Sequence, residues 1–161
     1  MKIFVTTAIN LASVSKTYLI LSPHITDDPT VKDVRYVDVK KLCLDGFADD
    51  GELEELVLDH VLDYTPLAEF ERVFNALIKK VRHGGTVIIN GVDAYLVCKN
   101  FVDQRASLEQ LNSSLYSQDP TLRKECSLTV AAVNELLTRA GFEILQRRLD
   151  IEQYTVKAKR P

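Results

Sequence analysis

The sequence predicts a single α/β domain with a largely parallel sheet, and two observations carry this prediction. Short apolar, β-branched runs that suit buried strands alternate along the 161 residues with amphipathic patterns that suit helices. Strands that alternate with helices form mainly parallel sheets, because each crossover needs a segment long enough to return the chain. No internal repeat, low-complexity tract or linker divides the sequence. We therefore expect one domain over residues 1–161.

The strands are predicted from apolar runs of four to six residues. One segment, residues 52–64, is ambiguous, because its apolar residues fit either a helical face or a short buried strand at 56–58 followed by a turn. The other expected strands cover residues 2–7, 17–21, 34–39, 86–90, 142–145 and 154–158.

Two helices have the clearest patterns. The first is expected over 70–81, with Thr65-Pro66 as its start and Gly84-Gly85 as its stop. The second is expected over 130–140, with Thr129 as its N-cap and Gly141 as its terminator.

Composition excludes several classes of function. The net charge of −3 and the pI near 5.6 argue against nucleic-acid binding, which needs clustered cationic side chains. No apolar run has the length of a membrane span, and the first residues lack a signal-peptide pattern, so we expect a cytoplasmic protein. Cys43, Cys98 and Cys126 are far apart among apolar neighbours, which indicates buried, reduced thiols. The histidines show no ligand spacing with them, so no metal site is expected.

Three stretches carry a resemblance to a known family. Residues 46–64 contain an acidic turn, an acidic pair, an apolar strand and then Asp59-His60-Val61-Leu62. Residues 81–89, Val-Arg-His-Gly-Gly-Thr-Val-Ile-Ile, form a helix exit followed by a strand, and residues 136–143 contain a Leu-Leu pair before Ala-Gly-Phe. In order and spacing these stretches resemble small class I S-adenosylmethionine-dependent methyltransferases of the type 11-like group.

The resemblance implies a fold and a cofactor. The fold would be a Rossmann-like three-layer sandwich with a seven-stranded, mostly parallel sheet and one antiparallel strand near the C-terminus. It would make 56–58 the fourth strand, which resolves the ambiguous segment in favour of a strand. The cofactor would be S-adenosylmethionine, bound at the carboxyl ends of the first strands.

The positions that hold this cofactor in the family are altered here. Residues 1–45 contain no glycine, so Thr6, Thr7 and Ala8 stand where the family has a glycine-rich loop. Ser22 stands where an acidic residue grips the ribose hydroxyls, and a hydroxyl is a weaker acceptor than a carboxylate. Asp38 matches the acidic residue near the adenine edge, although a turn aspartate after a strand explains it equally well.

The acceptor side matches the family better. Asp59-His60 follows the fourth strand, where the family has serine-histidine facing the transferred methyl group. His60 is therefore a candidate general base and Asp59 a candidate partner that orients it, the alternative for His60 being a packing histidine. Asp93 matches a turn aspartate of the family. Residues 95–127 form an irregular insertion where relatives bind their acceptors, and its apolar residues fit either a lid or interface, or the core: Phe101, Leu108, Leu111, Leu115 and Tyr116.

Two functions remain open at this point. One is an active methyltransferase with a divergent cofactor loop, acting on a small-molecule or unknown acceptor. The other is a catalytically inactive methyltransferase fold that serves as a binding or assembly module, with a protein partner or a second copy of itself. The altered loop and Ser22 favour the second function, and the match around His60 favours the first.

Overall fold

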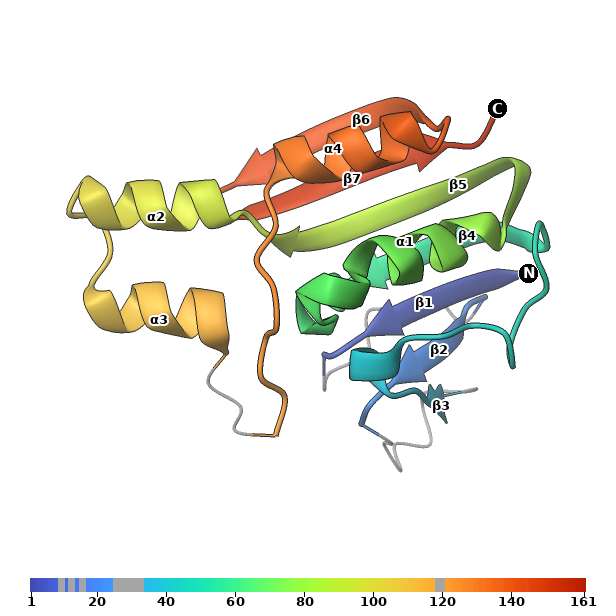
Figure 1. Cartoon of the computed structure of the whole chain (residues 1–161), viewed down its shortest axis with the longest axis horizontal. Helices are drawn as coiled ribbons and strands as arrows, with labels where there is room; N and C mark the ends of the chain where they lie inside the picture. The colour runs from blue at the N-terminus through green and yellow to red at the C-terminus, as the bar shows by residue number, and fades with distance from the viewer. Residues whose placement is uncertain (9–10, 12–13, 15–16, 25–33, 118–120) are drawn as a thin grey trace.

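A seven-stranded mixed sheet is the centre of the computed structural model, which describes the chain except residues 9–10, 12–13, 15–16, 25–33 and 118–120 (Figure 1). The strand order is β3-β2-β1-β4-β5-β7-β6. All neighbouring pairs are parallel except those of β7, which runs antiparallel to β5 and β6. This confirms the expected sheet with its antiparallel strand near the C-terminus. The strands are β1 (Lys2–Thr6), β2 (Leu19–Ser22), β3 (Val34–Tyr36), β4 (Leu53–Asp59), β5 (Val81–Val92), β6 (Glu143–Asp150) and β7 (Gln153–Lys159).

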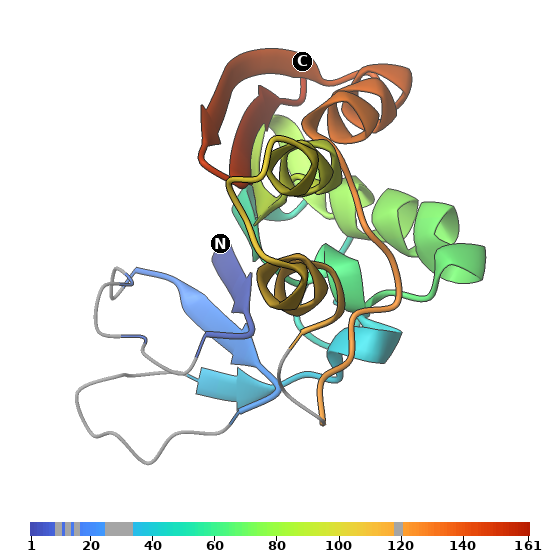
Figure 2. The same ribbon diagram turned by 90° about the vertical axis from the view of Figure 1, so that its left-hand side faces the viewer.

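Four α-helices accompany the sheet in the described part of the chain, and two of them cover it. Helices α1 (Phe70–Lys79) and α4 (Val130–Arg139) lie on the same side of the sheet (Figure 2). The other two, α2 (Ala94–Val102) and α3 (Leu108–Tyr116), extend beyond the end of β5 (Figure 1). Three short 3₁₀ helices complete the described elements: η1 (Val39–Lys41), η2 (Leu62–Tyr64) and η3 (Leu67–Glu69).

The hydrophobic core lies between the sheet and these two helices. Alternate residues of the central strands, such as Leu56 and Leu58 of β4 and Val87 and Ile89 of β5, are fully buried there. The helices contribute apolar side chains from one face each, including Phe74 of α1. A second helical layer, which a three-layer sandwich needs, would come from the β1–β2 and β2–β3 connections, and much of these lies outside the described residues.

Helix α1 begins and ends differently from the sequence prediction. It begins at Phe70, after η3, and Thr65 does not cap it; the buried hydroxyl of Thr65 has no hydrogen-bond partner among the described residues. It ends at Lys79, so Val81 belongs to β5, where it pairs with Leu53 of β4. At this end the carbonyls of Lys79 and Lys80 accept from the N–H groups of Gly51 and Leu53, and the Lys80 ammonium makes ion pairs at 2.6 Å with Asp45 and 2.9 Å with Asp50.

Gly84-Gly85 therefore lies inside β5 and not at the end of a helix. Gly84 has a φ of +75°, which a glycine adopts without strain. A Cβ on Gly85 would lie 2.9 Å from the backbone oxygens of Arg82 and Leu53. The two glycines lie where the pairing register of β5 with β4 shifts, between Val81, which pairs with Leu53, and Thr86, which pairs with Glu55. By contrast, α4 follows its prediction, with the hydroxyl of Thr129 accepting from the Ala132 N–H and Gly141 at a φ of +82°.

Two other expectations change with the structure. Cys43 and Cys98 are exposed, and only Cys126 is partly buried, so the prediction of three buried thiols is wrong for the first two. Apolar residues of the insertion predicted as lid or core are also exposed, with exposed fractions of 38% for Phe101, 61% for Leu108 and 54% for Tyr116. They do not pack into the core. Within the described chain, no helix has the length and apolar character needed to cross a membrane.

Candidate functional site

The carboxyl ends of β1 and β4 mark the point where the strand order reverses. Strands β2 and β3 follow on one side of β1, and β5 follows on the other side of β4. Where the strand order of an open α/β sheet reverses, the loops that follow neighbouring strands run to opposite sides of the sheet and leave a crevice. Ligands of such sheets bind in this crevice. Thr6 ends β1 and Asp59 ends β4, and the two residues are paired in register. The structure thus brings together two of the residues that the sequence singled out.

A hydrogen-bond network ties these strand ends together. The Thr6 hydroxyl donates to one carboxylate oxygen of Asp59 at 2.8 Å, and the Asn90 side-chain amide donates to the other at 3.0 Å. Thr6 is fully buried, while Asp59 is partly exposed. Both carboxylate oxygens of Asp59 are therefore engaged within the sheet. Asp59 has no hydrogen bond to His60 among the described residues, so it does not orient that imidazole.

The turn after β1 is built from side-chain contacts. The Ala8 N–H donates to the Thr6 hydroxyl at 3.0 Å, which is a local turn contact typical of threonine. Thr7 is partly exposed and Ala8 is exposed. The rest of the expected cofactor loop includes residues 9–10, 12–13 and 15–16, which lie outside the described residues.

Ser22 lies at the end of β2 and is fully buried. Its hydroxyl accepts from the His24 N–H at 3.1 Å, and its backbone carbonyl accepts from the Val37 N–H. These two hydrogen bonds hold the chain where it leaves β2.

Asp38, after β3, is exposed and caps η1 by accepting from the Lys40 N–H at 3.0 Å. It lines a cavity of about 340 Å³ at the ends of β2 and β3, together with Pro23, His24, Tyr36 and Leu122, among others. The turn-aspartate alternative agrees with this cap, and the match to the adenine edge stays a prediction.

His60 has an unusual backbone. Its φ is +54°, in the left-handed region that residues with a side chain rarely adopt. Its N–H donates to the Asn90 carbonyl at 3.0 Å, which fixes the chain at the end of β4 against β5. The residue is partly exposed. Such strained positions cluster at functional sites, because the surrounding structure must hold them in place.

A buried ion pair that sequence reasoning missed lies in the same region. Asp63 is 3% exposed, and the Lys124 ammonium lies 3.3 Å from its carboxylate and donates to the Ser114 carbonyl at 2.8 Å. Burial raises the pKa of Asp63 above its ordinary value, and the charge of Lys124 opposes this rise. No signal in the sequence joins two residues so far apart.

Cys126 lies next to this pair, and burial disfavours its reactive thiolate form. Its thiol donates to the Leu62 carbonyl at 3.4 Å, and burial raises its pKa to about 12. The thiol stays protonated at neutral pH, whereas the thiolate is the reactive form of cysteine.

Asp93 closes the insertion at both ends. It is 2% exposed, and its carboxylate accepts from the Leu96 N–H at 3.0 Å and from the Val130 N–H at 2.8 Å. One side chain thus caps α2 and also holds the first turn of α4. The turn-aspartate interpretation of Asp93 agrees with this geometry.

Comparisons with known proteins point to one fold. No family model matches the sequence, and no curated protein matches it either. Among solved structures, a methyltransferase from Methanosarcina mazei has a TM-score of 0.60 at 15% identity, covering 99% of this chain and 92% of its own. The 1,6-didemethyltoxoflavin-N1-methyltransferase of Burkholderia thailandensis, solved with S-adenosylhomocysteine, has a TM-score of 0.58 at 10% identity, with coverages of 99% and 70%.

A third structure extends the same pattern. An S-adenosylmethionine-dependent methyltransferase from Mesorhizobium loti has a TM-score of 0.59 at 13% identity, covering 91% of this chain and 81% of its own. At such identities a likeness shows the fold and not the activity. Together with the strand order and the single antiparallel strand, these likenesses show that the chain has the fold of the class I S-adenosylmethionine-dependent methyltransferases.

Proposed function

We propose that this protein is a methyltransferase-fold binding module that does not hold S-adenosylmethionine tightly. The observation that carries the proposal is the state of Ser22, which is fully buried with its hydroxyl engaged by the His24 N–H. The fold normally supplies a carboxylate at this position. A charge-assisted hydrogen bond contributes about 1.5–3 kcal/mol, so its loss lowers affinity roughly ten- to hundredfold.

The end of β1 supports the same conclusion. The Thr6 hydroxyl is committed to Asp59 and to the Ala8 N–H, so it stabilises the protein and not a ligand. Thr7 and Ala8 carry side chains where a glycine-rich loop would let the cofactor approach the backbone. Of the five residues predicted to bind the cofactor, Asp38 alone has a carboxylate, and it lines an open cavity. As a set, these residues do not fit the cofactor.

Calorimetric titration with S-adenosylmethionine and S-adenosylhomocysteine tests the proposal. We expect no binding, or dissociation constants in the millimolar range, for the wild type. The matched variant is Asp38→Asn, which removes the remaining carboxylate and retains the shape of the side chain. Micromolar binding that weakens in Asp38→Asn would contradict the proposal, because it would place the cofactor at the ends of β2 and β3.

One observation favours the alternative function, an active enzyme on an unidentified acceptor. His60 is partly exposed at the switch point and has a left-handed backbone, which is a feature that clusters at functional sites. If micromolar cofactor binding is measured, His60→Ala should abolish methyl transfer while the free energy of unfolding is retained. A folded His60→Ala protein that still transfers methyl groups would assign His60 a structural role.

A further inference from the structure

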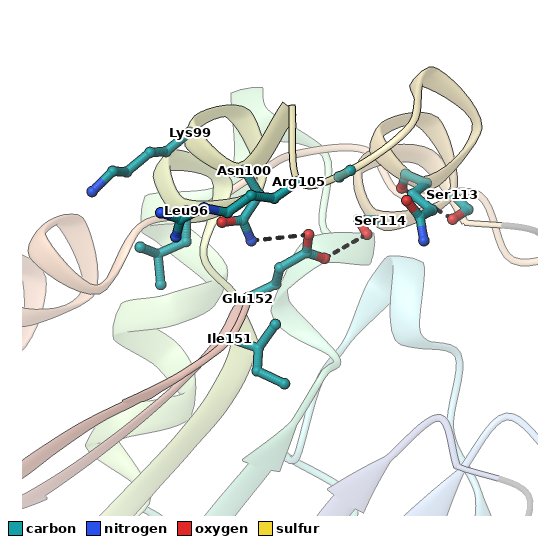
Figure 3. Close-up of a pocket in the computed structure, with 10 residues that line it drawn as sticks. Leu96, Lys99, Asn100, Arg105, Ser113, Ser114, Ile151 and Glu152 are labelled. Carbon is teal, nitrogen blue, oxygen red and sulfur yellow. Dashed lines mark hydrogen bonds between the residues drawn. The ribbon is translucent and has the colours of Figure 1, made fainter. Parts of the chain in front are cut away.

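An open cavity of about 630 Å³ lies between α2, α3 and the turn that joins β6 to β7 (Figure 3). Its volume is in the range of small-molecule sites. None of the residues at positions 6–8, 22, 38 or 60 lines it, whereas eight of its ten lining residues belong to the insertion 95–127, which the resemblance assigns to acceptor binding.

Glu152 fixes the shape of this cavity. One of its carboxylate oxygens accepts from the Ser114 hydroxyl of α3 at 2.9 Å, and the other accepts from the Asn100 amide of α2 at 3.4 Å (Figure 3). Its backbone carbonyl accepts from the Asp93 N–H at 2.7 Å. The hairpin turn and both helices are thus held around one side chain, and the negative charge of that side chain is already solvated by protein donors.

Two cations on the rim lack such partners. Lys99 and Arg105 are exposed, and neither side chain has a hydrogen bond or ion pair with another described residue. With Glu152 as the acidic lining residue, the cavity carries a net charge of +1. A guanidinium favours planar oxyanions, because its N–H groups match a carboxylate or a phosphate. The net positive charge of the lining residues therefore favours an anionic ligand.

Neutral polar groups line the space beside these cations. The carbonyl of the Gln110 side chain accepts from the Ser107 N–H, which leaves its two amide N–H groups free. The hydroxyls of Ser113 and Ser114 each donate once within the protein and still have lone pairs to offer. Such a mixture of donors and acceptors matches the hydroxyl groups of a polyol.

Ile151 gives independent evidence for a ligand. It lies in the two-residue turn between Asp150 and Gln153, lines the cavity, and is 83% exposed. Its φ is +51°, which is a strained backbone for a β-branched residue, and glycine is the usual choice at such a turn. The side chain of Ile151 is exposed and apolar although its backbone is strained, so it offers a contact surface to a bound molecule.

We propose that this cavity binds a small hydroxylated anion, such as a sugar acid or a sugar phosphate. Lys99 and Arg105 bind the carboxylate or phosphate group. Gln110 and the serines of α3 bind hydroxyl groups, and Ile151 packs against the apolar face of the carbon skeleton. The proposal stands whether or not S-adenosylmethionine binds.

Three probes that share one ring test it: glucose, glucuronate and glucose 6-phosphate, titrated at constant ionic strength and followed by the amide NMR signals of Asn100, Arg105 and Ser114. We expect saturable shifts with glucuronate, with glucose 6-phosphate, or with both, and at least tenfold weaker binding of glucose. Which anion binds tighter distinguishes a carboxylate ligand from a phosphate ligand. Equal responses to all three probes, or none, would overturn the proposal.

Variants separate the site from a general charge effect. Lys99→Gln and Arg105→Gln should each weaken binding of the preferred anion at least fivefold, whereas Arg147→Gln, an exposed arginine of β6 outside the cavity, should leave it unchanged. Ile151→Gly should raise the melting temperature by relieving the strained turn and should also weaken binding. Anion binding that falls equally in all the arginine variants, or that survives in Arg105→Gln, would overturn the proposal.

Discussion

The two faces of the sheet differ sharply in chemistry although they are built from the same strands. On the face under α1 and α4, the paired residues Leu58 and Ile89 are fully buried and apolar, as is Val156 of β7. On the opposite face, Ile88 is only partly buried and pairs with Lys157 of β7.

The opposite face, which we call the open face, also carries a polar network on the central strand. Glu55 of β4 accepts hydrogen bonds from the Tyr18 hydroxyl and, at 3.1 Å, from the Thr86 hydroxyl, and the Lys2 ammonium lies 3.9 Å away. Parallel sheets covered on both faces have nearly continuous apolar strands. The Glu55 carboxylate therefore lies among polar groups, whereas Ile20 of β2 and Val57 of β4 are buried on this same face. Among the described residues, no helix covers it (Figure 2).

The largest expected difference between the faces comes from two adjacent isoleucines of β5. Ile89→Ala should lower the free energy of unfolding by about 2–5 kcal/mol, because it leaves a cavity in the core. Ile88→Ala should lower it by less than half as much, because its side chain is already partly exposed. Urea denaturation of both variants measures the difference. Equal losses would break the comparison and show that the open face is covered in solution.

A smaller effect is expected at Glu55. Burial would raise the pKa of Glu55, but hydrogen bonds from Tyr18 and Thr86 and the charge of Lys2 outweigh it, so its pKa lies below the ordinary value of 4.5. Its contribution to stability is therefore present above pH 4.5 and is lost as the pH falls through the lowered pKa. Glu55→Gln should cost about 1 kcal/mol at pH 7. The two proteins should converge in stability near pH 3.

The pH dependence of this difference is the control for Glu55. Denaturation curves collected between pH 3 and pH 7 should show the gap between wild type and Glu55→Gln closing toward acid. A gap that stays constant over this range would mean that the charge of Glu55 contributes nothing, and that the polar network does not stabilise the open face.

The smallest effect is expected at Tyr154, on the covered face. The hydroxyl of Tyr154 is buried and has no hydrogen-bond partner among the described residues, and burial raises its pKa well above the ordinary value. Tyr154→Phe should therefore be neutral or stabilise the protein by up to about 1 kcal/mol, measured by thermal denaturation. A loss of more than about 1.5 kcal/mol would show that a buried water satisfies this hydroxyl.

The sequence predicted the fold better than the site, and β4 shows why. Its apolar run is too short for periodicity to separate a strand from a helix, and the resemblance over residues 46–64 decided in favour of the strand that the structure contains. The polar residues Glu55 and Asp59 of that strand are visible in the sequence. That they share one face follows from their even spacing in a strand. Their pairing with Thr86 and Asn90 requires the register of β5, which no local pattern encodes.

The cavity beside α2 and α3 was beyond prediction for a related reason. Exposed residues such as Lys99 and Arg105 carry no periodic signal, and Glu152 meets Asn100 and Ser114 only after the hairpin has folded back. Similarly, the pairing of Asp63 with Lys124 depends on the path of the whole insertion. Contacts between distant residues follow from packing, whereas the elements themselves follow from local sequence.

The carboxylate of Asp93 gives the insertion a modular character. The chain leaves the core at Ala94, whose N–H donates to the Leu128 carbonyl at 2.9 Å, so departure and return occur at one point. The closure entropy of a loop changes by only about 0.6 kcal/mol for each doubling of its length. Segments of very different length or sequence therefore fit between these two ends at little thermodynamic cost. At this junction, protein engineering can exchange the segment between Ala94 and Leu128 without rebuilding the sheet.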